Sequence, residues 1–213
     1  MTDISLGLDT FGDISTGADG QPKPMDQVLR DVVEEAAYAD ELGIDFIGLG
    51  EHHRDDFAIS APEIVLGAIA GRTKRIKLGI LAVSPYEMHP LKIANALLTL
   101  NELSNGRAVV AIGGGGSVMG ATGIKMDPKA QRMLRGVREA VEMVKHVTSG
   151  KFVQGYPGEL FKLSRPLKSS WAKAPKPGVF TCSTGPKMLE MAGRIADGTQ
   201  MSDVTPEKIG HHM

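Results

Sequence analysis

Short apolar runs alternate with segments of helical periodicity through the first half of the chain. The runs are apolar on both faces, which is typical of parallel strands in a sheet that helices cover. These runs are residues 4–8, 44–49, 76–83 and 108–112. Between them, apolar residues recur at helical spacing over residues 26–42, 62–73 and 90–103. The pattern therefore predicts the element order β-α-β-α-β-α-β.

Residues that favour helix ends stand at the predicted boundaries. Gly43 follows the first helix, where glycine commonly adopts the left-handed conformation that ends a helix. Pro62 stands in the first turn of the second helix, and Ser60 is its expected N-cap. Asn105 and Gly106 are expected to end the third helix.

The rhythm changes after the fourth predicted strand. Residues 117–127 are predicted to form a long loop, and residues 130–147 a long amphipathic helix. The stretch 150–177 is rich in proline, glycine and lysine and is expected to hold a short hairpin. The alternation then returns with a strand at 178–183, a helix at 186–196 and a weaker strand at 198–202.

The sequence thus predicts a single α/β domain over residues 1–213, in which the alternation is interrupted at about 117–177. A (β/α)8 barrel and a doubly wound sheet both satisfy the alternation, and periodicity does not choose between them. Six strands are predicted, whereas a complete barrel has eight. Either the chain is a fragment, or the barrel is incomplete at its C-terminus and its open edge is covered.

Composition narrows the classes of partner. The 24 basic and 25 acidic residues give a formal net charge of -1, so no charge excess favours nucleic acid or an anionic membrane. Cys182 is the only cysteine, which excludes a disulfide framework and a four-cysteine metal site. Residues 1–8 have no basic start, and no run approaches the roughly 18 apolar residues of a spanning helix. We expect a cytoplasmic protein that acts on a small-molecule substrate.

Two histidines, His52 and His53, follow the second predicted strand. Side chains at that point of a barrel strand face the mouth, where barrel enzymes carry out their chemistry. A histidine there exchanges protons or hydrogen-bonds a cofactor ring, although two polar loop residues bonded to their neighbours fit the sequence equally well. A zinc site is disfavoured, because adjacent strand residues point to opposite faces and no His-Glu-x-x-His helix is present.

Two further loops at the same end carry candidate binding residues. Residues 113–116 are all glycine, which lets the backbone approach a flat ring or a phosphate, but they match no dinucleotide or P-loop fingerprint. Residues 183–187, Ser-Thr-Gly-Pro-Lys, join the fifth strand to its helix, and their hydroxyls, N–H groups and lysine suit an anion. The alternative is an ordinary helix start that Ser183 or Thr184 caps.

Several short motifs together resemble the luciferase-like flavin-dependent oxidoreductases, over residues 6–204. They are Gly50-Glu51-His52-His53-Arg54, Arg72-Thr73-Lys74-Arg75-Ile76-Lys77-Leu78-Gly79, His89-Pro90 and Leu103-Ser104-Asn105-Gly106-Arg107. Each motif is short, but their order and spacing are specific together. The resemblance implies a (β/α)8-type TIM barrel with an insertion after strand four, and homodimers are common in this family.

The resemblance also implies a cofactor at the C-terminal mouth, either FMN or the 8-hydroxy-5-deazaflavin coenzyme F420. It places the catalytic histidine at His52, with His53 as the alternative. A non-prolyl cis peptide is expected at Leu81-Ala82. The isoalloxazine-type ring would contact Leu81, Ala82, Val83, Ser84, Gly113 and Gly114. The phosphate would lie near Ser183, Thr184, Gly185, Pro186 and Lys187.

The motifs divide between the two cofactors. Glu51-His52-His53 is similar to the FMN-using members, whereas residues 185–189 and 196–198 resemble the deazaflavin-using methylene-tetrahydromethanopterin reductases, to which the sequence leans. A deazaflavin carries hydride, which implies reduction or dehydrogenation, whereas a reduced flavin reacts with oxygen and supports monooxygenation. The rival hypotheses are a non-catalytic, flavin-binding barrel remnant and an inert fragment.

Overall fold

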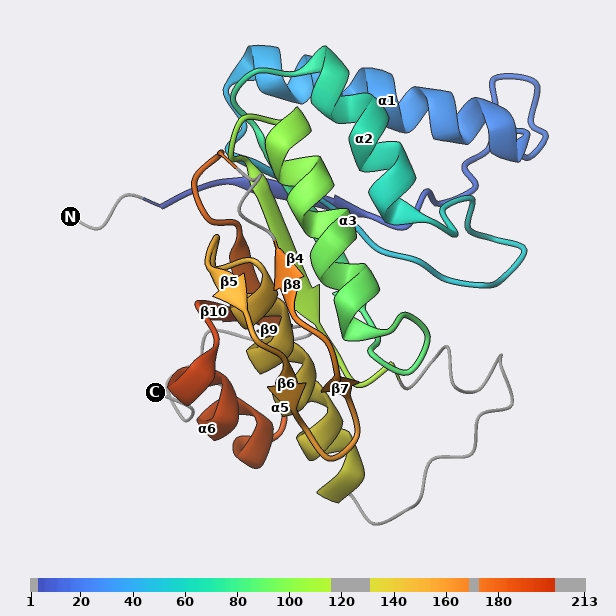
Figure 1. Cartoon of the computed structure of the whole chain (residues 1–213). Coiled ribbons are helices and arrows are strands. Elements are labelled where there is room, and N and C mark those ends of the chain that lie inside the picture. Colours follow the sequence, from blue (N-terminus) through green and yellow to red (C-terminus); the bar gives the residue numbers. More distant parts are fainter. Residues whose placement is uncertain (1–3, 116–130, 169–172, 202–213) are drawn as a thin grey trace.

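A computed structural model describes residues 4–115, 131–168 and 173–201. Six parallel strands form one sheet in the order β1-β2-β3-β4-β9-β10 (Figure 1). Their bounds are β1 Gly7–Thr10, β2 Phe46–Leu49, β3 Lys77–Val83, β4 Ala108–Ile112, β9 Gly178–Cys182 and β10 Gly198–Gln200. The order follows the chain without the reversal of a doubly wound sheet. The structure is therefore part of a barrel wall, which confirms the predicted incomplete barrel with six strands.

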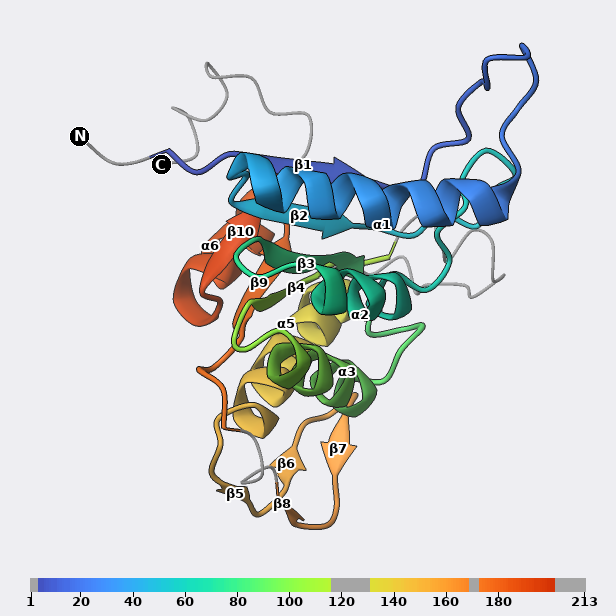
Figure 2. The same ribbon diagram turned by 90° about the horizontal axis from the view of Figure 1, so that it is seen from above.

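Helices pack side by side against the sheet, each against the next along the chain, a succession that can be followed in Figure 2. They are α1 Met25–Leu42, α2 Pro62–Arg72, α3 Pro90–Leu103, α5 Gln131–Val147 and α6 Pro186–Ile195. Their apolar faces and alternate strand residues, such as Leu78 and Val110, form one buried core. Among the described helices, none has the length and apolar character that crossing a membrane requires.

The opposite face of the sheet, which is the inside of the barrel, is open. Phe46, Leu81, Val109 and Phe180 from four strands line a hollow of about 370 Å³ on this face. Their neighbours on the other face of the same strands, such as Val110, are buried under the helices. The apolar residues on this inner face are therefore only partly covered, because six strands do not close a barrel wall around its interior.

Several predicted boundaries agree with the structure, and others differ by a few residues or in the capping residue. Gly43 ends α1 with a φ of 86°, as predicted. Ser60, by contrast, does not cap α2, because Ala61 occupies the N-cap position and no side chain bonds there. The first strand begins at Gly7 instead of residue 4, because the backbone N–H of Leu6 bonds the Asp45 carboxylate.

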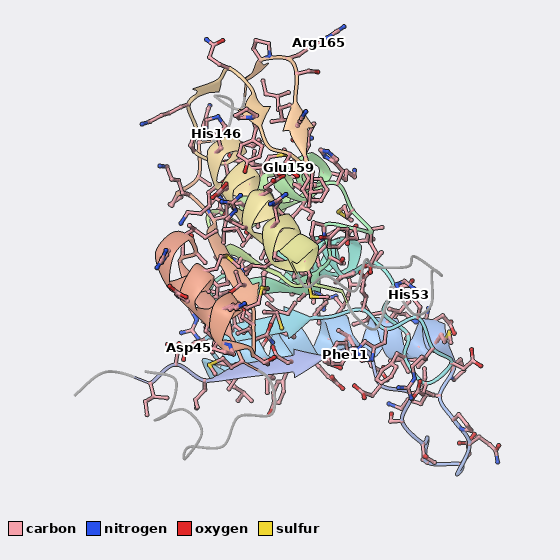
Figure 3. The ribbon with its side chains drawn as sticks, turned by 90° about the horizontal axis from the view of Figure 1, so that it is seen from below. Phe11, Asp45, His53, His146, Glu159 and Arg165 are labelled. Carbon is pink, nitrogen blue, oxygen red and sulfur yellow. The ribbon has the colours of Figure 1, made fainter. Side chains whose placement is uncertain are left out.

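The predicted hairpin in the insertion is present. It contains two short antiparallel strand pairs. The outer pair is β5 Phe152–Val153 with β8 Leu167–Lys168, and the inner pair is β6 Tyr156–Pro157 with β7 Lys162–Leu163. The buried carboxylate of Glu139 on α5 accepts hydrogen bonds from three backbone N–H groups at the hairpin tip, those of Glu159, Leu160 and Phe161. Figure 3 shows Glu159 and Arg165 in this hairpin, well away from Phe11 and His53. The predicted loop at 117–127 lies outside the described residues.

Hydrogen bonds tie together the loops at the end of the sheet where strands begin. The Arg107 guanidinium donates five bonds of 2.7–3.3 Å to the carbonyl oxygens of Ala70, Thr73, Ile76 and Ser104 and to the Thr73 hydroxyl. The Asp40 carboxylate accepts bonds of 2.6–2.9 Å from the backbone N–H groups of Lys74, Arg75 and Ile76. These two side chains join α1, α2, α3 and the start of β3 into one unit.

Candidate active site

A cavity of about 470 Å³ lies at the end of the sheet where the strands finish. Because all six strands are parallel, the residues that follow them converge there. The lining comprises Phe11, Glu51, His52, residues 81–84, Glu87, residues 113–115, Met133, residues 182–185, Met188 and Gln200. Figure 3 places Phe11 and His53 at this end of the sheet and Asp45, which precedes β2, at the other.

Four buried side-chain atoms in the described part of the chain have no hydrogen-bond partner. They are His52 Nδ1, Glu87 Oε1, Ser183 Oγ and Gln200 Oε1. All four residues line this one cavity. Buried polar atoms are almost always hydrogen-bonded, and an unpaired one costs roughly 1–3 kcal/mol. Four residues with an unpaired buried polar atom therefore gather around one cavity.

Aromatic packing fixes the His52 ring at the cavity wall. The ring stacks on Phe11, with 4.1 Å between centroids and 24° between planes, and meets the edge of Phe57 at 4.8 Å. The loop that carries Phe57 is bonded to the segment after β1, because the N–H of Ala58 donates to the carbonyl of Gly12 at 2.8 Å. The imidazole therefore has a fixed plane, and its Nδ1 is not used by the protein.

His53 occupies a different environment from His52. Its side chain is 40% exposed, and its Nε2 lies 4.0 Å from Glu51 Oε2. It does not line the cavity, whereas His52 does. Only His52 of the two candidate histidines therefore faces the cavity. Adjacent residues of an extended segment point to opposite sides, which accounts for the difference.

The loops after β3 and β4 form a close-packed wall of the cavity. The Leu81-Ala82 peptide is cis, as the resemblance implied, and the pairing of β3 with β4 shifts register at this point. Gly115 has a φ of +70°, and a Cβ atom there would lie 2.3 Å from Ser84 Oγ. Only glycine fits this close approach at position 115, and residues 81–84 and 113–115 together line this side of the cavity. Gly116, the last of the four glycines, lies outside the described residues.

The segment after β9 contributes only part of the predicted anion site. Ser183, Thr184 and Gly185 line the cavity, but Pro186 and Lys187 do not. Lys187 instead lines a separate groove of about 740 Å³ between α5 and α6. Gly185 is the N-cap of α6 with no side-chain bond, so the alternative in which Ser183 or Thr184 caps this helix is wrong. The positive end of the α6 dipole is left without a side-chain cap.

Two carboxyl groups meet in the cavity, Glu51 after β2 and Glu87 after β3, and they are hydrogen-bonded to each other. Burial, together with this bond and repulsion from Glu51, raises the pKa of Glu87 to about 7. Burial also raises the pKa of Glu51, although its bond to Glu87 and the nearby His53 act in the opposite direction. The pair therefore holds a proton near neutral pH.

Several lining residues had no predicted role. They are Phe11, Glu51, Glu87, Met133, Cys182, Met188 and Gln200. Phe11, Cys182 and Gln200 follow or end strands, so strict inside–outside alternation along each strand was the signal that would have found them. Met133 and Met188 reach the cavity from α5 and α6, and their placement depends on packing that the sequence pattern does not record.

Comparison with known proteins agrees with this geometry. The profile of the luciferase-like monooxygenase family matches residues 9–213. The chain belongs to this family. The luciferase-like chain is similar to RslO1, a monooxygenase from Streptomyces bottropensis whose crystal structure superposes with a TM-score of 0.79 at 25% identity. That match covers 98% of this chain and 63% of RslO1, which confirms the barrel-type fold.

Two curated relatives of this luciferase-like chain are reductases or dehydrogenases by name. A 5,10-methylenetetrahydromethanopterin reductase from Archaeoglobus fulgidus is 34% identical over 172 residues, which cover 79% of this chain and 48% of the relative. An F420-dependent glucose-6-phosphate dehydrogenase from Amycolatopsis mediterranei is 29% identical over 177 residues, covering 79% and 52%. The chain spans about half the length of these relatives.

Proposed function

We propose that this chain is an oxidoreductase that binds a flavin-type cofactor in the mouth cavity and acts on a small organic substrate. One observation carries the proposal: the unpartnered buried polar atoms His52 Nδ1, Glu87 Oε1, Ser183 Oγ and Gln200 Oε1 all belong to residues that line this cavity. Its volume of about 470 Å³ is in the range of small-molecule sites.

The lining residues fit such a cofactor. Residues 81–84 and 113–115, three of which are glycine, offer a wall that an isoalloxazine-type ring can approach closely. Ser183 and Thr184, beside the uncapped start of α6, offer hydroxyls and a helix dipole to a phosphate. When bound, a deazaflavin supplies or accepts a hydride, and a flavin can also activate oxygen.

The protein's own groups orient the reactants and manage protons. Phe11 and Phe57 fix the ring of His52, so that its Nδ1 stays at the cavity wall and is available to accept or donate a proton. Leu81, Met133 and Met188 are apolar parts of the lining and exclude water from the reacting atoms. His53, which is outside the cavity, is the weaker candidate for this role.

Coenzyme F420 is favoured over FMN. The relative from Amycolatopsis mediterranei is named as F420-dependent, and the motif at residues 185–189 resembles the deazaflavin-using branch. Hydride transfer is accordingly the favoured reaction, and FMN-dependent monooxygenation is the alternative that the likeness to RslO1 supports.

Parallel titrations of the purified chain with coenzyme F420 and with FMN test this proposal. We expect dissociation constants of about 1 μM or below for one of them, corresponding to about -8 kcal/mol, with F420 the tighter ligand. Binding of FMN alone changes the reaction class to oxygen chemistry. Binding of neither, by a chain that unfolds cooperatively in urea, contradicts the proposal.

Cofactor binding without turnover is a second candidate function, and the open inner face of the sheet favours it. Phe46, Val109 and Phe180 line a hollow on that face, which a closed barrel would fill. A bound cofactor that is neither reduced nor oxidised by a panel of small alcohols, ketones and imines supports this second function. Cofactor turnover with any of them supports the first.

A further inference from the structure

The loop between β3 and α3 holds Glu87 rigidly at the cavity. The backbone N–H groups of Glu87 and Met88 donate to the carbonyl oxygen of Ser84 at 3.2 and 3.1 Å. The N–H of Tyr86 donates to the hydroxyl of the buried Ser84 at 3.3 Å. The Glu87 carboxyl is therefore positioned by a compact turn, and its Oε1 is buried in the cavity wall without a partner.

The partner of this carboxyl is another carboxyl. Glu51, whose side chain is 15% exposed, hydrogen-bonds Glu87 from the end of β2. Two carboxylates have only acceptor atoms, so a hydrogen bond between them requires that one of them carries a proton. The other charged groups that face the pair are His53, 4.0 Å from Glu51, and Glu63 on α2.

The surroundings decide which form of the pair is stable. Burial and the presence of Glu51 raise the pKa of Glu87 to about 7, so the neutral acid persists well above the pH at which an exposed glutamate ionises. No lysine or arginine is among the described residues that line the cavity. Among the residues that the structure describes, Glu63 adds negative charge near Glu51, and His53 acts in the opposite direction.

Other atoms of the cavity point independently to a ligand. Ser183 is 97% buried, being only 3% exposed, and its Oγ has no partner. His52 Nδ1 and Gln200 Oε1 are also unpartnered and belong to lining residues of the same cavity. The acidic pair therefore belongs to a site built for a bound molecule.

We propose that Glu87, hydrogen-bonded to Glu51, is the proton donor of this site and selects a neutral substrate that presents a carbonyl or imine acceptor. This inference rests on the proposed function. When hydride adds to the substrate carbon, the π-electron pair moves to the acceptor atom, which takes the Glu87 proton and leaves a carboxylate. The two electrons come from the reduced flavin-type cofactor, which is oxidised. Carboxylate and phosphate substrates are disfavoured by repulsion from the acidic pair.

The first test follows glutamate ionisation in the cofactor-free chain, by NMR of ¹³C-labelled glutamate side chains across a pH titration. We expect one glutamate resonance to titrate near pH 7, and Glu87→Gln to remove it. Glu63→Gln, which changes a charge near the pair without entering the cavity, is the matched control and should retain it. A wild-type chain in which every glutamate titrates at ordinary values overturns the proposal, whether or not the variants fold.

The second test uses two probes of similar size, cyclohexanone and cyclohexanecarboxylate, with binding followed by saturation-transfer NMR. We expect the ketone to bind at about pH 6 and to weaken at least about threefold by about pH 8.5, and the carboxylate not to bind at either pH. Glu87→Gln should keep ketone binding and lose its pH dependence, because the amide donates at every pH. A merely structural glutamate would not produce that difference.

Three outcomes overturn the inference. They are absence of ketone binding, equal binding of the carboxylate, and a Ca²⁺-induced loss of the titration near neutral pH, which would make the pair a cation site. Neither test needs the cofactor. A failed cofactor titration therefore leaves these results standing, and a failed glutamate titration leaves the cofactor result standing.

Discussion

The two ends of this sheet differ in whether their polar side chains are hydrogen-bonded. Where the strands begin, Arg107 donates five hydrogen bonds and Asp40 accepts three, so loops from separate helices are joined through satisfied polar groups. Where the strands finish, His52, Glu87, Ser183 and Gln200 each keep a buried atom without a partner. The first arrangement stabilises the free protein, and the second makes it less stable than it would be with apolar residues.

This difference separates residues that hold the fold from residues that serve a ligand. A protein retains unsatisfied buried groups where the bound molecule supplies the missing partners, at the expense of stability in its absence. Substitutions at the two ends should therefore have opposite consequences. At the beginning of the strands they should lower stability, and at the mouth they should impair binding or turnover while leaving stability unchanged or improved.

The largest effect is expected from Arg107→Ala. The substitution leaves the carbonyl oxygens of Ala70, Thr73 and Ile76 without their charged donor, and we expect the free energy of unfolding to fall by about 3 kcal/mol. Urea denaturation measures this loss of unfolding free energy. Arg165→Ala, at an exposed arginine of the hairpin, is the control and should change stability by less than about 0.5 kcal/mol. Equal effects of the two substitutions would mean that the hydrogen bonds of Arg107 do not stabilise the fold.

The next effect is catalytic. We expect His52→Ala to lower turnover of the cofactor-loaded chain at least about tenfold, with cofactor affinity little changed, because one of the groups that can accept or donate a proton at the cavity is lost. His53→Ala, at the exposed neighbour, serves as the matched comparison and should retain most of the rate. Steady-state rates together with a cofactor titration measure both quantities. An unchanged rate in His52→Ala removes this residue from the mechanism.

A smaller, pH-dependent effect is expected at Asp40. Burial alone would raise the pKa of Asp40, but hydrogen bonds from the N–H groups of Lys74, Ile76 and Arg75 lower it below its ordinary value. The stabilisation is thus present above the unfolded-state pKa of about 3.9 and is lost as the pH falls through the lower folded-state pKa. Asp40→Asn should cost about 1 kcal/mol near pH 7, since the group is well solvated, and progressively less in acid.

Urea denaturation of Asp40→Asn and wild type as a function of pH measures this dependence. Asp55→Asn, at an exposed carboxylate, is the comparison and should leave the unfolding free energy nearly unchanged at every pH. A deficit in Asp40→Asn that stays constant from neutral to acid pH would mean that the charge of Asp40 contributes nothing.

The smallest effects come from two buried serines at opposite ends. Ser104 is fully buried, donates to the carbonyl of Asn101 and accepts from the N–H of Arg107, both at 3.3 Å. Ser104→Ala should cost about 1 kcal/mol. Ser183 has an unpartnered hydroxyl, so Ser183→Ala should leave stability unchanged or raise it by up to about 0.5 kcal/mol. Urea denaturation measures the unfolding free energy of both variants. Because each variant loses one serine hydroxyl, the two values compare the two ends of the sheet directly.

Periodicity predicted the order and type of the elements, whereas several boundaries and helix caps differ in the structure. The six strands and the helices at 62–73 and 90–103 were predictable from their apolar patterns. The strands are short apolar runs, and the helices repeat apolar residues at helical spacing. The choice of a barrel over a doubly wound sheet required the resemblance, since both satisfy the same alternation. Helix caps were the weak point: Pro62 and Pro186 begin α2 and α6 without a side-chain cap, because their fixed φ already suits a first helical position.

The candidate site was predictable where it follows strands and not where it depends on packing. His52, residues 81–84 and Gly113 and Gly114 were placed at the mouth because parallel strands end there. Lys187 was expected beside them, but it follows Gly185 into α6 and faces another groove. Glu87 had no motif to distinguish it, because its significance comes from contact with Glu51, which is distant in sequence.

Unfolding free energy with and without saturating cofactor tests the central claim most directly, for wild type and for Ser183→Ala. At a free cofactor concentration of about 100 times the dissociation constant, the wild type should gain about 2.7 kcal/mol. Without cofactor, the unfolding free energy of Ser183→Ala should equal or exceed that of the wild type. With cofactor at the same concentration, the variant should gain less unfolding free energy than the wild type. A wild type that gains nothing from either F420 or FMN, or a Ser183→Ala chain that is less stable without cofactor and gains equally with it, contradicts the claim that the unpartnered atoms await a ligand.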